Sequence, residues 1–300
     1  MSNQNYPKFY RQRFILTLLR QAGGSLSKMD FQKLLFLSHK KTGVRYYNFV
    51  PYHYGCYSFQ AASDLETLHC LGWLELREKD IKLLHNLPFD KGLKASETEE
   101  IIRFVRGYQG YGSRKLVRLV YEQYPYYAVK SKMARDVLSK DVFERIEKER
   151  RHISSQESVV FTIGYEGISF EEYVNMLVRN DIRLLCDVRK NALSRKFGFS
   201  KGTLSSLLPK LGIKYLHVPG LGIVADKRKQ LKTEDDYRRL FDEYRKTISE
   251  KETYLQDLVT LLESNKRIVL TCFEKIPTSC HRHCISDYLA AQKSVRVVHL

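Results

Sequence analysis

The residues of this 300-residue chain that could do chemistry gather in its C-terminal half. Cys186-Asp187-Val188-Arg189 follows one apolar run, Cys272-Phe273-Glu274 follows another, and Cys280-His281-Arg282 comes shortly after. Carboxylates act as bases or nucleophiles, thiols act as nucleophiles, and guanidinium groups neutralise phosphate or carboxylate. This combination is suited to hydrolytic or transfer chemistry on an anionic substrate.

The elements that must position these residues are strands and helices in alternation. Short β-rich runs occupy 159–163, 183–187, 214–218, 267–272 and 295–299, and amphipathic helices fill the gaps. The pattern predicts an α/β fold with a mostly parallel five-stranded sheet covered by helices on both faces. Ligands of such sheets bind at the carboxyl ends of the strands, where the unusual residues lie.

Helix caps are expected around the same edge of the sheet. Ser169 opens a capping box with Glu172, Ser200 caps another helix, and Ser279 is expected to cap a helix that begins at Cys280. Free amides and the dipole at that last helix start favour an anion, and Arg282 adds a bidentate donor. The segment is therefore a predicted phosphate site, where the pKa of Cys280 is expected to be lowered.

Each residue of the predicted site has an expected role. Glu274 is the expected base or covalent nucleophile, Asp187 orients its neighbours, and Tyr165 stacks on a base. An Asp–Arg pair that only fixes a loop is the alternative for Asp187 and Arg189. The predicted catalytic residues are Glu274, Asp187, His281 and Cys280, and the predicted substrate- or phosphate-binding residues are Tyr165, Glu166, Arg189, Arg195, Arg282 and Cys272.

Other chemistries fit the pattern less well. Cys280 and Cys284 share a helix face, but His281 lies outside it and no second cluster at zinc-finger spacing completes four ligands. We therefore expect no metal and no cofactor. Strands that end in Asp-Val-Arg also occur in rhodanese domains, but Cys272-Phe273-Glu274 does not reproduce their catalytic loop. Neither a dinucleotide fingerprint nor a P-loop is present.

The C-terminal half resembles the domain-of-unknown-function family numbered 488. The similar segments are Thr162 to Gly167, Asp187-Val188-Arg189 with Ser194-Arg195, Gly212 to Tyr215, Leu221-Gly222, and Cys272-x-Glu274 with Cys280-His281-Arg282. Asn191-Ala192-Leu193 stands where relatives often have a proline, and a further glycine is common beside Leu221-Gly222. The family has no established activity, so the resemblance implies a fold and a site rather than a reaction.

The N-terminal region has the pattern of a winged-helix layout. Residues 11–84 read as helix, turn, helix, loop, helix and two short strands, with Ser27 capping the second helix and Gly72 ending the third. An all-helical module with an added hairpin is the alternative. Lys33 to Leu37, Phe49 to Ser58, Asp64-Leu65 and Leu71 to Leu74 resemble small winged-helix-like domains related to the Panacea antitoxin domain, although Cys56 replaces their usual proline. This resemblance implies binding or regulation.

The connecting region 95–155 reads as three helices in which basic and aromatic residues alternate. Lysine and arginine neutralise phosphates while tyrosine rings stack on bases, so a nucleic acid would satisfy both sets. A solvated basic face over a tyrosine-rich core is the alternative. The predicted nucleic-acid-binding residues are Arg103, Arg106, Arg114, Lys115, Arg118, Lys130 and Lys132, and the tyrosines are Tyr108, Tyr111, Tyr121, Tyr124, Tyr126 and Tyr127.

Composition limits the class of protein. The formal net charge of +17 favours a polyanionic partner, and we expect DNA in preference to RNA. Six cysteines without paired spacing predict a reducing cytoplasm, and the absence of a long apolar stretch predicts no membrane partner. The sequence leaves the oligomeric state open.

These observations predict three parts and one leading function. The parts are a winged-helix-like domain at 1–94, a basic tyrosine-rich helical connector at 95–155 and the α/β domain at 156–300. The leading hypothesis is a nucleic-acid-binding enzyme, a hydrolase or glycosylase, acting at a glycosidic or phosphate centre. The alternatives are a non-catalytic DNA-binding sensor of a small anion, which gains nothing from Glu274 beside the anion, and a thiol-based enzyme using Cys280.

Overall fold

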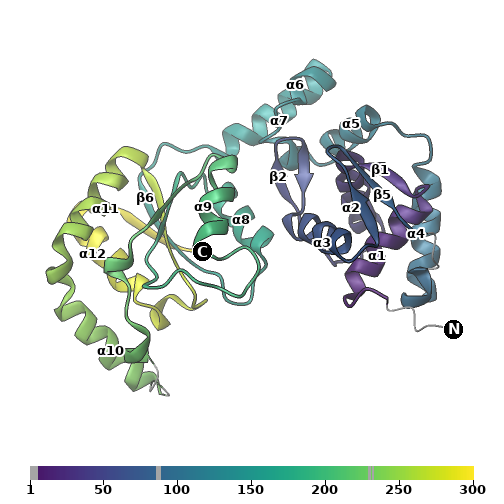
Figure 1. Cartoon of the computed structure of the whole chain (residues 1–300). Coiled ribbons are helices and arrows are strands. Elements are labelled where there is room, and N and C mark those ends of the chain that lie inside the picture. Colours follow the sequence, from purple (N-terminus) through teal and green to yellow (C-terminus); the bar gives the residue numbers. More distant parts are fainter. Residues whose placement is uncertain (1–5, 86–88, 229–230, 232) are drawn as a thin grey trace. The chain divides into compact units, whose positions relative to one another are not determined.

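The chain forms two compact units. The computed structural model describes residues 6–85, 89–228, 231 and 233–300 (Figure 1). Unit one comprises Met1–Arg151 and unit two comprises His152–Leu300. Within the described residues, no helix has both the length and the apolar character needed to cross a membrane.

The first part of unit one combines three helices with short antiparallel strands. The helices are α1 (Tyr10–Gln21), α2 (Lys28–Thr42) and α3 (Phe59–Cys70), and the strands are β1 (Ser25–Ser27), β2 (Val50–Tyr52), β3 (Gly55–Tyr57), β4 (Leu74–Leu76) and β5 (Asp80–Leu83). β2 and β3 form a hairpin, and the other three form a sheet of order β1-β5-β4. Ser27 caps α2 as expected, because its side chain accepts a hydrogen bond from the Asp30 amide.

The expected connector is largely part of unit one. Its helices are α4 (Ala95–Gly107), α5 (Ser113–Gln123), α6 (Ala134–Val137) and α7 (Lys140–Ile153). Ile101, Phe104 and Val117 are buried in the same core as Phe14 and Phe31 of the first helices. The structure thus differs from the predicted three-part division, because the apolar faces of the connector helices complete the core of unit one.

Unit two has the predicted α/β fold. Its strands are β6 (Val159–Gly164), β7 (Leu184–Asp187), β8 (Lys214–His217), β9 (Arg267–Cys272) and β10 (Arg296–His299), and its helices are α8 (Phe170–Arg179), α9 (Lys201–Leu207), α10 (Glu234–Lys246), α11 (Glu252–Asn265) and α12 (Arg282–Lys293). The strand order is β10-β6-β9-β7-β8, and all neighbouring pairs are parallel. The carboxyl ends of β6, β7 and β9 therefore meet at one edge.

Helices cover both faces of this sheet (Figure 1). Leu184 and Ile268 from the strands share a core with Leu258 of α11 and Ile285 of α12. On the opposite face, the hydroxyl of Tyr173 in α8 donates a hydrogen bond to Thr271 of β9 at 2.7 Å. The sheet is thus buried on both sides, as the near-continuous apolar strands predict.

Two of the three predicted caps in unit two are confirmed and one is wrong. Ser169 forms the capping box with Glu172, and Ser200 accepts from the Thr203 amide. Ser279 instead lies in the 3₁₀ turn Pro277–Ser279, Cys280 is extended with φ of −143°, and α12 begins only at Arg282. Ser279 belongs to the proline-initiated turn, so the helix starts two residues later than its cap pattern indicated.

Candidate functional site

A pocket of about 390 Å³ lies in unit two where β6, β7 and β9 end. Cys272, which is 2% exposed, and His281, which is fully buried, form the floor of this pocket. The exposed side chains of Lys190, Leu193 and Arg195 line its mouth. The remaining lining residues are Tyr165, Arg189, Asn191, Ser194, Ile223 and Phe273.

Asp187 and Arg189 form a buried ion pair beside the pocket. Nε and Nη2 of Arg189 donate to the two carboxylate oxygens at 2.8 and 2.5 Å, and its backbone amide donates to the same carboxylate at 3.2 Å. The Tyr215 hydroxyl also donates to Asp187 at 2.8 Å. The pKa of Arg189 is raised although burial alone would lower it, because Asp187 stabilises the cation. Asp187 therefore holds Arg189 in place, a contact that an Asp–Arg pair fixing a loop would also make, and the catalytic role of Asp187 stays a prediction.

Tyr165 lies in a different environment from the one predicted. Its ring is 4% exposed and is stacked on Phe199, with ring centroids 4.3 Å apart. Its hydroxyl accepts a hydrogen bond from Arg189 at 2.8 Å. The structure thus places Tyr165 in support of the arginine, and its covered ring leaves no face for a base. Phe273, at 44% exposure, is the aromatic ring that the pocket presents, and the sequence analysis assigned it no role.

The loop that carries Glu274 is held by backbone contacts. The carboxylate of Glu166 accepts from the Lys275 amide at 3.0 Å, and the Glu166 amide donates to the Phe273 carbonyl at 2.9 Å. A Cβ added to Gly164 would lie 1.8 Å from the Glu274 carbonyl oxygen, so only glycine permits this approach. Glu166 thus anchors the loop after β9.

Arg282 is also part of this support. Its side chain is fully buried, and Nη1 and Nη2 donate to the carbonyls of Glu274 and Lys275 at 2.5 and 3.0 Å. The predicted role in binding phosphate does not match this placement, because the guanidinium faces the protein backbone. Arg195 and Lys190 are the exposed cations at the mouth of the pocket.

Two thiols and an imidazole meet at the pocket floor. The ligand atoms of Cys272, Cys280 and His281 all lie within 4.8 Å of one another. His281 Nε2 lies 3.0 Å from the Val188 carbonyl, which can only accept, so Nε2 carries the proton and Nδ1 is directed at Cys280 Sγ, 3.8 Å away. Glu274 adjoins the cluster, because Cys272 Sγ donates to Glu274 Oε2 at 3.1 Å.

The thiol of Cys280 does not have the lowered pKa expected of a helix start. Burial, followed by the hydrogen bond and charge interaction with Cys272, raises its pKa well above the ordinary value. Cys280 is fully buried, and α12 begins two residues after it. Nucleophilic activation of this thiol by a helix dipole is therefore wrong for this structure.

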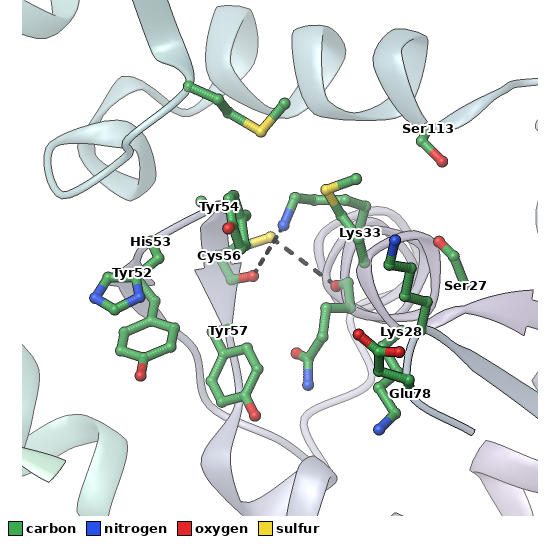
Figure 2. A pocket seen from close by; sticks show the side chains of 15 residues that line it. Ser27, Lys28, Lys33, Tyr52, His53, Tyr54, Cys56, Tyr57, Glu78 and Ser113 are labelled. Carbon is green, nitrogen blue, oxygen red and sulfur yellow. Dashed lines mark hydrogen bonds between the residues drawn. The ribbon is translucent and has the colours of Figure 1, made fainter. Parts of the chain in front are cut away.

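A second, larger pocket lies within unit one. It measures about 600 Å³ and is lined by residues of α2, the β2–β3 hairpin and α5 (Figure 2). Lys33, 2% exposed, extends from α2 and donates to the Cys56 carbonyl at 3.2 Å. Burial lowers the pKa of Lys33 and raises that of Cys56 to about 11. The sequence analysis quoted Lys33 only as part of a resemblance and assigned it no function.

The predicted nucleic-acid-binding side chains are exposed on unit one, whereas the tyrosines pack inward. Tyr121 is fully buried and hydrogen-bonded to Ser131, and Tyr126 is 8% exposed. Neither ring is therefore accessible for stacking on a base. Tyr111 borders a hollow of about 630 Å³ together with basic residues of α5. The exposed basic set comprises Arg103 and Arg106 of α4, Arg114, Lys115 and Arg118 of α5, and Lys130 and Lys132.

Comparison with known families supports the resemblance of unit two to the domain-of-unknown-function family numbered 488. Residues 169–289 match the model of a family described as "Domain of unknown function DUF488". The matched segment contains the Asp187–Arg189 pair, the three residues Cys272, Cys280 and His281, and Glu274. No curated protein matches the chain.

Proposed function

We propose that this protein is a nucleic-acid-binding enzyme in which the pocket of unit two carries out hydrolytic or transfer chemistry on a nucleotide or base. Unit one binds the nucleic acid, with DNA as the preferred polymer. The buried free thiols fit a reducing cytoplasm. The observation that carries the proposal is the pocket at the ends of β6, β7 and β9, which combines cations at its mouth with reactive groups at its floor.

The charge of this pocket favours an anionic substrate. Lys190 and Arg195 line its mouth, and Arg189 lies deeper, held by Asp187. No carboxylate belongs to the described side chains that line the pocket. Phosphate oxygens of a nucleotide would be neutralised by the two mouth cations, while the exposed ring of Phe273 offers a surface for the base.

Glu274 is the proposed general base. Its side chain is half-buried and adjoins the floor through Cys272, and its backbone is fixed by Arg282. A carboxylate in a fixed position can take a proton from an attacking water, which contributes roughly 10²–10⁴-fold to a rate. A sensor that only binds an anion would gain nothing from this carboxylate, so Glu274 favours the catalytic alternative.

The arrangement of unit one supports a winged-helix-like role. The order is helix, strand, helix, the β2–β3 hairpin, helix and two further strands, and β1 pairs with β5 in a sheet of order β1-β5-β4. The exposed basic side chains of α4 and α5 add the charge needed to bind a phosphate backbone. This unit therefore provides a place for the polymer, independent of the pocket in unit two.

Salt dependence of binding tests the proposed role of unit one. Arg103→Ala with Arg106→Ala removes two exposed cations, so the slope of log K against log salt is expected to fall by about 2 on duplex DNA. Lys293→Ala with Arg296→Ala is the matched control, because these exposed cations are paired with Glu263 and Glu157. An unchanged slope in the first double variant would contradict the assignment.

Product identification tests the proposed chemistry. The purified protein is incubated with single- and double-stranded DNA and RNA, and released bases and fragments are identified by mass spectrometry. Free bases would indicate a glycosidic centre, and shortened strands would indicate a phosphate centre. Binding without any product would contradict an enzyme acting on the polymer and would support the non-catalytic sensor instead.

A further inference from the structure

We propose that Cys272, Cys280 and His281 bind a zinc ion at the floor of the pocket in unit two, with water as its exchangeable fourth ligand. The inference rests on the proposed function, which it makes more specific: the enzyme becomes a metal-assisted hydrolase. We expected no metal from the sequence, because His281 lies outside the helix face shared by Cys280 and Cys284 and no second cluster at zinc-finger spacing supplied a further partner. The end of β9 supplies that partner as Cys272.

The geometry of the three side chains fits zinc. The three ligand atoms lie within 4.8 Å of one another, and Cys280 Sγ lies 3.8 Å from His281 Nδ1. In a tetrahedral site with Zn–S bonds of about 2.3 Å and Zn–N bonds of about 2.1 Å, ligand atoms are roughly 3.5–3.8 Å apart. Small side-chain movements therefore suffice to coordinate the ion. Two sulfurs and an imidazole are also a donor set that zinc prefers over magnesium or calcium.

The surroundings of His281 fit a metal ligand. Histidines that bind metal donate their other ring N–H to a carboxylate or a backbone carbonyl, which fixes the ring and the tautomer. Here Nε2 lies 3.0 Å from the Val188 carbonyl, and Val188 follows directly on Asp187 in the chain. The lone pair of Nδ1 is thereby directed to the thiols. The loop that presents the Asp187–Arg189 pair thus also orients this imidazole.

Charge balance explains how a buried ion is tolerated. Without metal, burial raises the pKa of Cys280 and favours its protonated form. Zinc binding displaces one proton from each thiol to solvent, so two thiolates compensate the two positive charges of the ion. The ion and the two thiolates together therefore carry no net charge.

The position of the site connects the ion to the chemistry. Cys272 and His281 line the pocket, so an ion held between them faces the space in which a substrate binds. Zinc lowers the pKa of bound water to about 7. Glu274, next to Cys272, takes the proton that this water loses, and the hydroxide adds to the electrophilic carbon or phosphorus of the substrate. Glu274 then returns the proton to the leaving group.

Cobalt binding tests the site with the metal alone. The full chain is reduced, treated with a chelator and titrated with Co²⁺, whose bonds to thiolate sulfur give near-ultraviolet charge-transfer absorption. One Co²⁺ per chain with this absorption is expected, displaced by one Zn²⁺. Cys272→Ser, Cys280→Ser and His281→Ala should each weaken binding at least ten-fold. Cys284→Ser, which alters a buried cysteine outside the cluster, should bind like the wild type.

Alkylation provides a readout that does not depend on folded variants. In the reduced wild-type chain, saturating Zn²⁺ should slow alkylation of Cys272, mapped by mass spectrometry, while the rate at the exposed Cys70 stays constant. Absence of charge-transfer absorption together with unchanged alkylation of Cys272 would overturn the proposal. Equal loss of binding in Cys284→Ser and Cys272→Ser would also overturn it.

The metal proposal and the proposed function can fail separately. Stoichiometric zinc binding without turnover of any nucleic acid would support the zinc site and contradict the proposed function. Turnover that persists after complete metal removal would support the proposed function and contradict the zinc site. Both are supported if removal of the metal abolishes turnover, Zn²⁺ restores it, and Glu274→Gln binds zinc normally but turns over at least 100-fold more slowly.

Discussion

The pocket beside Lys33 in unit one and the pocket at the strand ends of unit two differ in how their buried polar groups are arranged. In the larger pocket of unit one, the amine of Lys33 meets a backbone carbonyl among tyrosine, methionine and lysine side chains. At the floor of the smaller pocket in unit two, the ligand atoms of Cys272 and His281 lie within 4.8 Å of the Cys280 thiol, and Cys272 donates a hydrogen bond to the adjoining carboxylate of Glu274. We therefore place the proposed chemistry in the pocket of unit two because reactive groups converge beside it, and not because of its size.

The largest expected effect concerns the ion pair beside the pocket of unit two. Asp187→Asn leaves the buried guanidinium of Arg189 without its counter-charge, so unit two should lose about 3–5 kcal/mol of stability. Hydrogen exchange of peptides covering β7 and β9 measures this loss. Asp257→Asn, at an exposed position of α11, is the control and should change exchange by less than about 0.5 kcal/mol. Equal exchange in both variants would contradict the supporting role of the pair.

The pH dependence of unit one should come from a buried histidine. Burial lowers the pKa of His39 to about 4, while the unfolded chain has the ordinary value near 6.5. Between these values the unfolded state binds the additional proton, so the free energy of unfolding falls by about 3 kcal/mol as the pH drops from 6.5 to 4. The single tryptophan, Trp73, lies in unit one and reports its urea unfolding.

A substitution of His39 separates its contribution to the pH dependence of stability from the contributions of carboxylates and of other imidazoles. His39→Gln should flatten the stability profile between pH 4 and 6.5, whereas His69→Gln, at an exposed position of α3, should retain the slope. A slope that persists unchanged in His39→Gln would show that other groups cause the loss.

A smaller effect is expected from Lys33. Its pKa is lowered by burial, so the unfolded chain binds more protons below the ordinary value of 10.5, and the stability of unit one should rise as the pH increases towards that value. Lys33→Met removes this dependence and should stabilise the unit by about 1 kcal/mol at pH 7. Lys41→Met, exposed on the same helix, is the control. If Lys33→Met instead destabilises unit one by an amount that does not vary with pH, burial of the Lys33 amine does not destabilise the folded state.

Much of the fold of unit two follows from local patterns. Each of the five strands lies within one residue of its predicted bounds, because each is a short β-rich run and amphipathic helices separate the runs. The capping box at Ser169 and the helix cap at Ser200 are likewise local and were predicted. The strand-end position of Asp187, Cys272 and Glu274 followed directly from this alternation.

The remaining features depend on contacts between distant segments. Cys272 meets Cys280 only because the turn Pro277–Ser279 brings the chain back to the end of β9. The covered ring of Tyr165 results from stacking on Phe199, which no local pattern encodes. The burial of Tyr121 similarly depends on the close approach of Gly55 in the β2–β3 hairpin. Residue type therefore identified the candidates, whereas their roles required the three-dimensional arrangement.

The most direct test of the account is turnover by the wild type and by Glu274→Gln on the nucleic acid that yields a product. If Glu274 is the general base, Glu274→Gln should bind this nucleic acid as the wild type does, and its kcat should fall at least 100-fold. Glu263→Gln, at an exposed carboxylate of α11, should keep wild-type kcat. Equal kcat for Glu274→Gln and the wild type would contradict the assignment of catalysis to the pocket of unit two.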